Sequence, residues 1–252
     1  MRTIYFYLYM VITMIALSPK MLFFKKKKNT MPSNEFAEMS YVTVRNYAMR
    51  HLKICGAKIH LNGLENIPHN RAALFVSNHQ GLFDIAIFLA LIPTSKGVIA
   101  KAELKKIPIL RTWMEYINCV FMDRKDLKKS AKAILDGVEI LKSGYSMLIF
   151  PEGTRSRCDT VADFKAGSFK LATKAKVPIV PVTIDGTYKL MEANGGHICP
   201  ADVRVQIHPA IETAELSPED VYTLPERVRK IICSSLPVYA AQHHAGSETA
   251  PI

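Results

Sequence analysis

The sequence lacks the residue patterns that mark several common classes of enzyme. Its five cysteines include no Cys-x-x-Cys pair, which argues against a structural zinc site and a disulfide framework and is compatible with a reducing compartment. The absence of a Gly-x-Ser-x-Gly elbow argues against a lipase-type serine nucleophile. Walker, Gly-x-Gly-x-x-Gly and His-Glu-x-x-His motifs are also absent, which disfavours nucleotide cofactors and a catalytic zinc ion. We therefore expect neither a metal nor a cofactor.

The composition is that of a folded chain with an unusual surface. Of the 252 residues, 49% are hydrophobic, and the 12 glycines and 14 prolines are too few for collagen-like or low-complexity sequence. A formal net charge of +11 occurs beside a slightly positive mean hydropathy of +0.08. A partner that is both apolar and anionic would match this combination, and a phospholipid surface has both properties. Nucleic acid is the competing partner.

The N-terminus carries an apolar segment followed by four consecutive lysines. Residues 4–17 form an uninterrupted apolar run, which is shorter than the roughly 20 residues needed to cross a bilayer. Extended to Phe24 the segment is long enough, but it then contains Pro19 and Lys20. Basic residues on both sides, including the lysines at 25–28, favour a segment that enters one leaflet and returns, and leave a single span open. The sequence lacks an Ala-x-Ala site for signal cleavage.

A second helical pattern covers residues 35–54, where apolar residues are interleaved with Arg and Lys. It fits an ordinary surface helix packed on the domain, and it equally fits a helix in the membrane interface. We expect three regions: a membrane-associating helical segment over 1–54, an α/β domain over 55–235 and a flexible tail over 236–252.

From about residue 59 onward, short apolar runs alternate with longer stretches of helical pattern. The short runs indicate buried strands, and the stretches between them indicate helices. Alternation at these lengths predicts one α/β domain with a largely parallel sheet flanked by helices. The predicted strands are 72–76, 97–100, 119–122, 147–150, 179–182 and 203–207, and the predicted helices are 83–91, 103–116, 127–141 and 168–176.

A histidine and an aspartate follow the strand predicted at 72–76. Ligands bind at the carboxyl ends of strands in such sheets, and His79 leaves this strand five residues before Asp84, where a helix begins. The carboxylate can fix the tautomer of the imidazole and leave its other nitrogen as a general base. The alternative is a helix-capping or packing histidine. A second pair with this spacing, His197 and Asp202, has no strand before it and indicates a surface loop.

Cationic and hydroxyl residues follow further predicted strands. Gly153, Thr154 and Arg155 can cradle a phosphate or a carboxylate, for which the alternative is a polar turn. Arg124 also follows a strand, and Lys101 closes another as the weakest candidate. A base without an enzyme nucleophile suggests direct transfer, in which the base activates a hydroxyl of the substrate.

Four short blocks of residues occur in a fixed order between about residues 58 and 209. They are Asn78, His79 and Asp84 of an Asn-His-x4-Asp block; Lys101, Leu104, Pro108, Phe121 and Arg124 of a second block; Phe-Pro-Glu-Gly-Thr-Arg-Ser at 150–156, followed by Phe164, Lys165 and Gly167; and Val-Pro-Ile-Val-Pro-Val at 177–182. In this order they resemble the 1-acylglycerol-3-phosphate acyltransferases of glycerolipid synthesis. Gly81 departs from a serine often found in the first block, and Arg111 and Asn118 depart from glycines often found in the second. These departures bear on acceptor selectivity.

The resemblance implies a reaction that agrees with the chemistry of the residues. His79, oriented by Asp84, would deprotonate the 2-hydroxyl of 1-acylglycerol-3-phosphate, a lysophospholipid acceptor. That oxygen would attack the thioester of acyl carrier protein or coenzyme A and give phosphatidic acid. The implied location is an anionic membrane surface at the cytoplasmic face of the cell membrane, with no nucleic-acid partner. The implied substrate-binding residues are Lys101, Arg124 and Arg155 for the phosphate, Glu152 and Gly153 for the glycerol, and also Asn78 and Thr154.

Two alternatives use the same observations. The chemistry is unchanged if the acceptor is another lysolipid, such as a lyso-ornithine lipid, which Gly81 and the second block motivate. A non-enzymatic basic protein that binds anionic lipid or nucleic acid would explain the net charge of +11. It would not explain a base and an anion cradle at successive strand ends.

Overall fold

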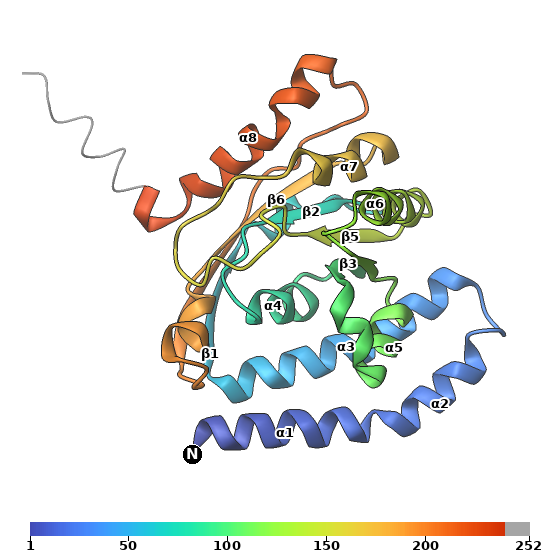
Figure 1. The fold of residues 1–252 in the computed structure, drawn as a ribbon, viewed down its shortest axis with the longest axis vertical. Helices are drawn as coiled ribbons and strands as arrows, with labels where there is room; N and C mark the ends of the chain where they lie inside the picture. Colours follow the sequence, from blue (N-terminus) through green and yellow to red (C-terminus); the bar gives the residue numbers. More distant parts are fainter. Residues whose placement is uncertain (240–252) are drawn as a thin grey trace, which may run out of the picture.

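The computed structural model describes residues 1–239, which fold around a seven-stranded sheet (Figure 1). The strands are β1 (Ala57–Asn62), β2 (Leu74–Ser77), β3 (Lys96–Lys101), β4 (Val120–Met122), β5 (Ser146–Ile149), β6 (Ile179–Asp185) and β7 (Ala201–Ile207). Their order across the sheet is β1-β7-β6-β2-β5-β3-β4, and all neighbours are parallel except β6 and β7. The predicted fold class, a largely parallel sheet flanked by helices, is confirmed.

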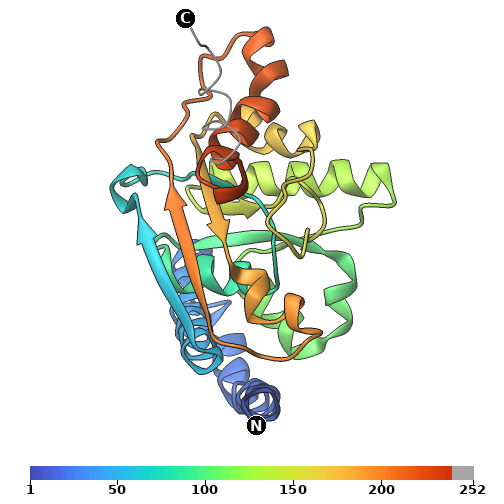
Figure 2. The ribbon, with the colours of Figure 1, turned by 90° about the vertical axis from the view of Figure 1, so that its left-hand side faces the viewer.

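Helices cover both faces of the sheet because side chains alternate between the two faces of each strand. On β2, Phe75 shares a core cluster with residues of α1, α3 and α4, whereas Leu74 and Val76 share one with residues of α6, α7 and α8. Figure 2 shows helices on both sides of the sheet. The α-helices are α1 (Arg2–Ala16), α2 (Ser18–Lys27), α3 (Ser33–Cys55), α4 (Phe83–Leu91), α5 (Pro108–Tyr116), α6 (Leu127–Lys142), α7 (Lys170–Ala175) and α8 (Pro218–Ser234), and the 3-10 helices are η1 (Leu64–Asn66), η2 (Ala102–Lys106), η3 (Ala166–Phe169), η4 (Thr187–Leu190) and η5 (Glu192–Asn194).

Most predicted elements occur within a few residues of their expected ends, and α4 matches its prediction at both ends. The helix predicted at 103–116 is divided into η2 and α5, because Pro108 has a fixed φ that suits the first residue of a helix rather than its middle. The helix predicted at 168–176 is likewise divided, into η3 and α7. β1 and α8 were not predicted from the sequence. α8 begins at a capping box formed by Ser217 and Asp220.

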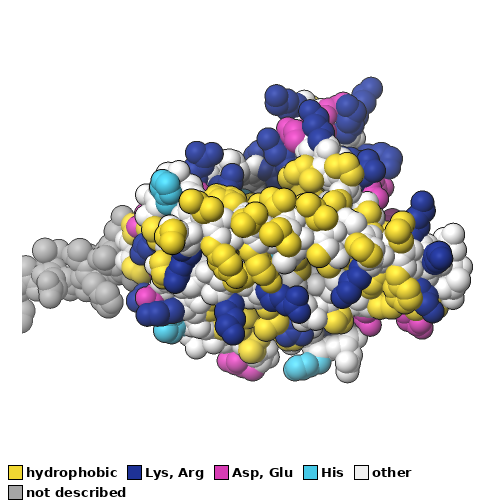
Figure 3. All heavy atoms as spheres, turned by 90° about the horizontal axis from the view of Figure 1, so that it is seen from below, with side chains coloured by type: hydrophobic (Ala, Val, Ile, Leu, Met, Phe, Trp, Pro, Cys, Tyr) yellow, Lys and Arg dark blue, Asp and Glu magenta, His cyan; other side chains and the backbone are white. Residues whose placement is uncertain are grey.

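The N-terminal helices lie along the base of the molecule. α1 and α2 are separated only by Leu17 and run beside α3 and α5 (Figure 1). An aromatic cluster of Phe24, Phe36, Trp113 and Tyr116 attaches α2 to α3 and α5. Arg2–Lys27 is long and apolar enough to cross a membrane by length and composition, and only 6% of its apolar window is buried. Seen from below, this base shows a broad band of apolar side chains with Lys and Arg around it (Figure 3).

The packed domain continues beyond the predicted boundary at residue 235. Leu236 is fully buried in the core, and the Tyr239 hydroxyl accepts a hydrogen bond of 3.3 Å from the backbone N–H of Val161. The tail predicted from residue 236 therefore begins no earlier than residue 240. Residues 240–252, on which the rest of that prediction falls, lie outside the described residues.

Candidate active site

Three neighbouring strands bring their carboxyl ends together at the candidate site. β2 lies between β5 and β6, and the register pairs Val76 with Ile149 on one side and with Pro181 on the other. The loops after β2 and β5 are joined directly, since the backbone N–H of Ser156 donates to the carbonyl of His79 at 2.8 Å. Side chains that follow three separate strands thereby share one small region of the protein.

His79 and Asp84 form the predicted pair. His79 Nδ1 lies 2.7 Å from Asp84 Oδ2, and the Asp84 carboxylate is fully buried. The same oxygen accepts from the backbone N–H of Gly81 at 2.9 Å, and the Thr187 hydroxyl donates to Asp84 Oδ1. The His79 ring stacks on Phe150 with centroids 4.0 Å apart. Since Nδ1 faces the carboxylate, Nε2 is the nitrogen that can take a proton from a substrate.

The side chains of Asn78 and Glu152 bond to the protein backbone close to this pair. Asn78 is fully buried, and its amide makes two hydrogen bonds with the backbone of Ile184, at 2.8 and 2.9 Å. Glu152 is 5% exposed, and its two oxygens accept from the backbone N–H groups of His79 at 2.7 Å and Ala162 at 3.0 Å. Burial raises the pKa of the Glu152 carboxyl, and these two N–H groups oppose that rise. Both side chains are therefore bonded to the protein backbone, and the substrate-binding roles predicted for them stay predictions.

The three cations predicted to hold one phosphate have different neighbours. Lys101 is exposed and pairs with Glu103 at 3.3 Å. Arg155 pairs with Glu192 at 2.8 Å. Arg124 instead lies beside Gly153, a glycine with a positive φ of 79°, in the space that a side chain at that position would face.

Lys165 also reaches this space: a Cβ built on Gly153 would lie 2.9 Å from Lys165 Nζ and 3.5 Å from Arg124 Nη1. Thr154 is exposed on the same loop. Two cations therefore converge on the backbone of Gly153, while Arg155 is held by a carboxylate.

An apolar cavity of about 520 Å³ opens next to Gly153. Phe150 lines this cavity as well as stacking on His79, so the cavity and the His79–Asp84 pair share a wall. Lysine and arginine side chains line it alongside the apolar residues. The apolar lining includes Ile99, Met122, Leu127, Ile134, Leu135 and Ile149, and the cations are Arg124, Lys165, Lys170 and Lys174.

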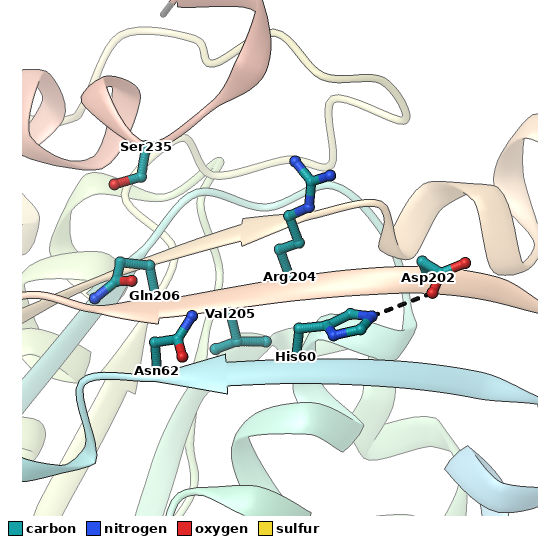
Figure 4. Close-up of a pocket in the computed structure, with 7 residues that line it drawn as sticks. All are labelled: His60, Asn62, Asp202, Arg204, Val205, Gln206 and Ser235. Atoms are coloured by element: carbon teal, nitrogen blue, oxygen red, sulfur yellow. Dashed lines mark hydrogen bonds and ion pairs between the residues drawn. The ribbon is translucent and has the colours of Figure 1, made fainter.

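A second cavity, of about 450 Å³, lies over the face of β1 and β7 (Figure 4). Figure 4 shows His60 and Asp202 side by side on these strands, with His60 Nε2 3.2 Å from Asp202 Oδ1. Both side chains are more than 60% exposed, unlike those of His79 and Asp84. Asp202 thus pairs with His60 rather than His197, which is exposed in the loop before β7, so the surface loop predicted around His197 is present.

The sequence reading missed several polar residues of the site. The Gln80 side chain accepts from the backbone N–H of Gly186 at 2.8 Å, and Thr187 donates to Asp84. Glu192 and Lys165 contact the cations or the glycine described above. Lys165 stands within the Phe-Lys-x-Gly stretch, which was a usable signal. Residues 187–192 follow the last matched block and carry no pattern of their own.

Within residues 1–239, no group of three or more His, Cys, Asp or Glu side chains is close enough to ligate a metal ion.

Comparison with known proteins places this sheet and its His–Asp pair in a family of acyl-transferring enzymes. The chain belongs to the acyltransferase family, whose family model matches residues 58–185. The matched segment includes His79, Asp84, Arg124 and Arg155, and it ends before Glu192.

Relatives with curated names make the comparison more particular. A probable 1-acyl-sn-glycerol-3-phosphate acyltransferase of Mycoplasma pneumoniae is 34% identical over 172 residues, which cover 67% of this chain and 64% of that protein. The 1-acyl-sn-glycerol-3-phosphate acyltransferase of Borreliella burgdorferi is 29% identical over 79% of each chain. The crystal structure of PlsC, the 1-acyl-sn-glycerophosphate acyltransferase of Thermotoga maritima, superposes with a TM-score of 0.79 at 27% identity, covering 99% of this chain and 97% of that one.

Proposed function

We propose that this protein transfers an acyl chain from an acyl thioester to the 2-hydroxyl of 1-acylglycerol-3-phosphate, giving phosphatidic acid. The observation that carries the proposal is the contact of 2.7 Å between His79 Nδ1 and the buried Asp84 carboxylate. Membership of the acyltransferase family and the activities for which the relatives are named support the same reaction.

The proposed mechanism needs one base and no covalent enzyme intermediate. His79 Nε2 takes the proton of the acceptor hydroxyl while Asp84 stabilises the imidazolium through Nδ1. The acceptor oxygen attacks the thioester carbonyl, the tetrahedral intermediate collapses, and the thiolate leaves with the proton that His79 carried. A thioester is already activated, so positioning and general-base help of about 10²–10⁴-fold account for the protein's part in the chemistry.

The cations of the site are assigned to the anionic groups of the two substrates. Arg155 lies two residues from Gly153 in a loop that is hydrogen-bonded to the His79 loop, so we assign it to the acceptor phosphate. Arg124 and Lys165 converge on Gly153 at the apolar cavity and supply a second anion-binding position. Lys101 is exposed near the ends of β3 and β4 and adds to the positive field there.

The apolar cavity beside Gly153 is proposed to hold an acyl chain. Its aliphatic lining suits a hydrocarbon, and Arg124, Lys165, Lys170 and Lys174 suit the phosphate of a phosphopantetheine arm. Acyl carrier protein and coenzyme A share that arm, so both are tested as donors.

The base formed by α1 and α2 is proposed to lie in one leaflet at the cytoplasmic face of the membrane. Ile4, Leu8 and Ile12 are each more than half exposed on α1. The opposite side of α1 is packed on the domain, where Phe6 contacts Phe83 at the start of α4 with ring centroids 5.6 Å apart. A single span would strip these contacts away, whereas insertion in the plane of one leaflet keeps them.

Thiol release by the purified protein tests the proposal. Acyl carrier protein and coenzyme A thioesters are each offered with 1-acylglycerol-3-phosphate and with a lyso-ornithine lipid, and the product is identified by mass spectrometry. His79→Ala is expected to abolish transfer, and His60→Ala, which removes the exposed pair on β1, is expected to leave it within about twofold. Near-normal transfer by His79→Ala in a folded, membrane-bound protein would refute the mechanism.

A further inference from the structure

Glu192 holds the arginine that we assign to the acceptor phosphate. Its Oε1 accepts from Arg155 Nη1 at 2.8 Å and from the backbone N–H of Leu82 at 2.8 Å. The Glu192 side chain is 5% exposed, whereas that of Arg155 is 33% exposed. A buried carboxylate therefore holds one N–H group of the guanidinium, while the rest of the Arg155 side chain still reaches solvent.

Gly81 provides the space for this carboxylate. A Cβ built on Gly81 would lie 2.7 Å from Glu192 Oε2, which is closer than real Cβ contacts come. Gly81 does not have a positive φ, so its backbone conformation suits other residues as well. The obstacle to a larger residue at this position is the contact of its Cβ with Glu192. Gly81 stands where the resembling family often has serine, and Glu192 lies outside the matched segment 58–185.

From these contacts we infer that Glu192 is a positioning residue that sets the affinity for the acceptor's phosphate through Arg155, and that Gly81 is its structural counterpart. The inference rests on the proposed function for the identity of the acceptor. Glu192 is too buried to meet the phosphate itself. Its effect arises because Arg155 is already ordered when the phosphate arrives, which avoids the cost of immobilising a long side chain on binding.

The segment that carries Glu192 supports a positioning role. Thr187, at the start of the segment, donates to Asp84, so the segment contacts both the His79–Asp84 pair and Arg155. Glu192 and Leu82 also join the segment to the first turn of α4, where a negative charge is favourable. The two functional groups are thus held by one short stretch of chain.

The experiment compares an acceptor with phosphate and one without it. KM and kcat are measured for 1-acylglycerol-3-phosphate and for 1-acylglycerol with the wild type, Gly81→Ala, Glu192→Ala, Glu192→Gln and the Gly81→Ala/Glu192→Ala double variant. Glu192→Ala and Gly81→Ala are each expected to raise KM for the phosphate acceptor about 3- to 10-fold with kcat within about twofold. For 1-acylglycerol, which has no phosphate for Arg155 to bind, both variants should raise KM less than they do for the phosphate acceptor.

Two internal controls separate positioning from general damage. Glu192→Gln keeps an oxygen for Leu82 and Arg155 and should recover part of the affinity. Gly81→Ala should add nothing in the Glu192→Ala background, because the carboxylate that its Cβ displaces is gone. Equal losses with both acceptors, additive effects of the two substitutions or an unchanged KM would each overturn the inference. Circular dichroism is used to check that every variant is folded.

Binding measured by calorimetry distinguishes a failure of the role inferred for Glu192 from a failure of the proposed reaction. The dissociation constant of 1-acylglycerol-3-phosphate is measured with the same substitutions in a His79→Ala background, where no turnover occurs. The same 3- to 10-fold weakening, with a smaller effect on the binding of 1-acylglycerol, would support the role of Glu192 even if transfer to this acceptor failed. A wild type that transfers to it while the Glu192 variants bind it unchanged would overturn the inference alone.

Discussion

The base formed by α1 and α2 differs from the site at the strand ends in how far its side chains are buried and hydrogen-bonded. On α1, Ile4 and Leu8 are 72% and 57% exposed, and the helix is attached by few polar bonds, such as that from Tyr7 Oη to the Gly196 carbonyl at 3.1 Å. At the strand ends, Asn78 and Asp84 are fully buried, and their polar atoms are paired with other groups of the protein. The fold thus pairs the polar groups of Asn78 and Asp84, whereas it leaves an apolar face of the base uncovered.

This difference implies that chemistry and membrane location are largely separable. The two regions are in contact through one segment, residues 191–198. This segment bonds to Tyr7 and Thr3 of α1 and also contains Glu192, which pairs with Arg155. Substitutions at the strand ends should change turnover or stability without changing lipid binding, and substitutions on the outer face of α1 should do the reverse.

The largest expected effect comes from removing the charge that orients His79. Asp84→Asn is expected to lower kcat roughly 10²–10⁴-fold, because the amide no longer enforces the tautomer that leaves Nε2 free to take a proton. Steady-state kinetics and vesicle sedimentation check it, and Asp202→Asn, at the exposed pair with His60, serves as the control. Loss of vesicle binding by Asp84→Asn would contradict the separation of the two regions.

The reverse effect is expected on α1. The Leu8→Glu/Ile12→Glu double variant should weaken binding to anionic vesicles by about 10²-fold, because two aliphatic side chains no longer enter the lipid. Transfer to a water-soluble short-chain acceptor should stay within about twofold. Val221→Glu/Tyr222→Glu places the same charges on exposed apolar positions of α8, at the far end of the molecule, and should not change binding (Figure 1). Equal weakening by both double variants would show that net charge, rather than the base, governs binding.

A smaller effect is expected where a buried amide joins two strand ends. Asn78→Ala should lower the free energy of unfolding by about 2–3 kcal/mol, because the N–H and carbonyl of Ile184 lose their partners in the interior. Asn194→Ala removes an exposed amide that donates to the Lys189 carbonyl and should cost less than about 1 kcal/mol. Chemical denaturation of both variants measures the difference. Equal losses of unfolding free energy would contradict a stabilising role for the buried Asn78–Ile184 hydrogen bonds.

The smallest effect concerns Lys96, a buried residue at the start of β3 that bonds to both α3 and α4. Its buried Nζ contacts the Tyr41 hydroxyl of α3 at 2.6 Å and the carbonyls of Phe88 and Ile92 at 3.1 Å. Burial, with a contribution from Arg45, lowers the pKa of Lys96 well below its usual value. Between the folded pKa and about 10.4, the unfolded chain binds more protons, so stability rises with pH by up to about 1.4 kcal/mol per unit.

Denaturation of wild type and Lys96→Met between pH 7.5 and 9 checks this prediction. The wild type should gain stability relative to the variant as the pH rises. This range stays below the pKa values of Tyr41 and Tyr145, which burial raises. Parallel stability curves for the two proteins would contradict it.

The sequence predicted much of the sheet and the central pair of the site. The strands of the parallel sheet are continuous apolar runs because both of their faces are buried, and such runs are visible without a structure. His79 and Asp84 are five residues apart at one strand end, so local geometry was enough to pair them. β1 was missed because its side chains alternate between half-buried and exposed positions, with Lys58 and His60 facing outward.

Burial and distant neighbours could not be predicted in the same way. Nothing in the residue type of Asn78 or Glu152 shows that its side chain bonds to the protein backbone rather than to a substrate. The partners of Asp84 and Arg155 on the far side of the site, Thr187 and Glu192, stand more than 30 residues away from them. Contacts of that separation depend on how strands are ordered in the sheet, which the chain pattern does not encode locally.

The sequence by itself determined the apolar N-terminus, the α/β alternation and the pairing of His79 with Asp84, because each depends on residues that are close together in the chain. Only the tertiary structure decided that β6 lies next to β2, which brings Thr187 and Glu192 to the His79 loop. It also decided that α1 lies flat against the domain rather than standing away from it. Both depend on long-range packing, in which burial of side chains far apart in the chain outweighs local preference.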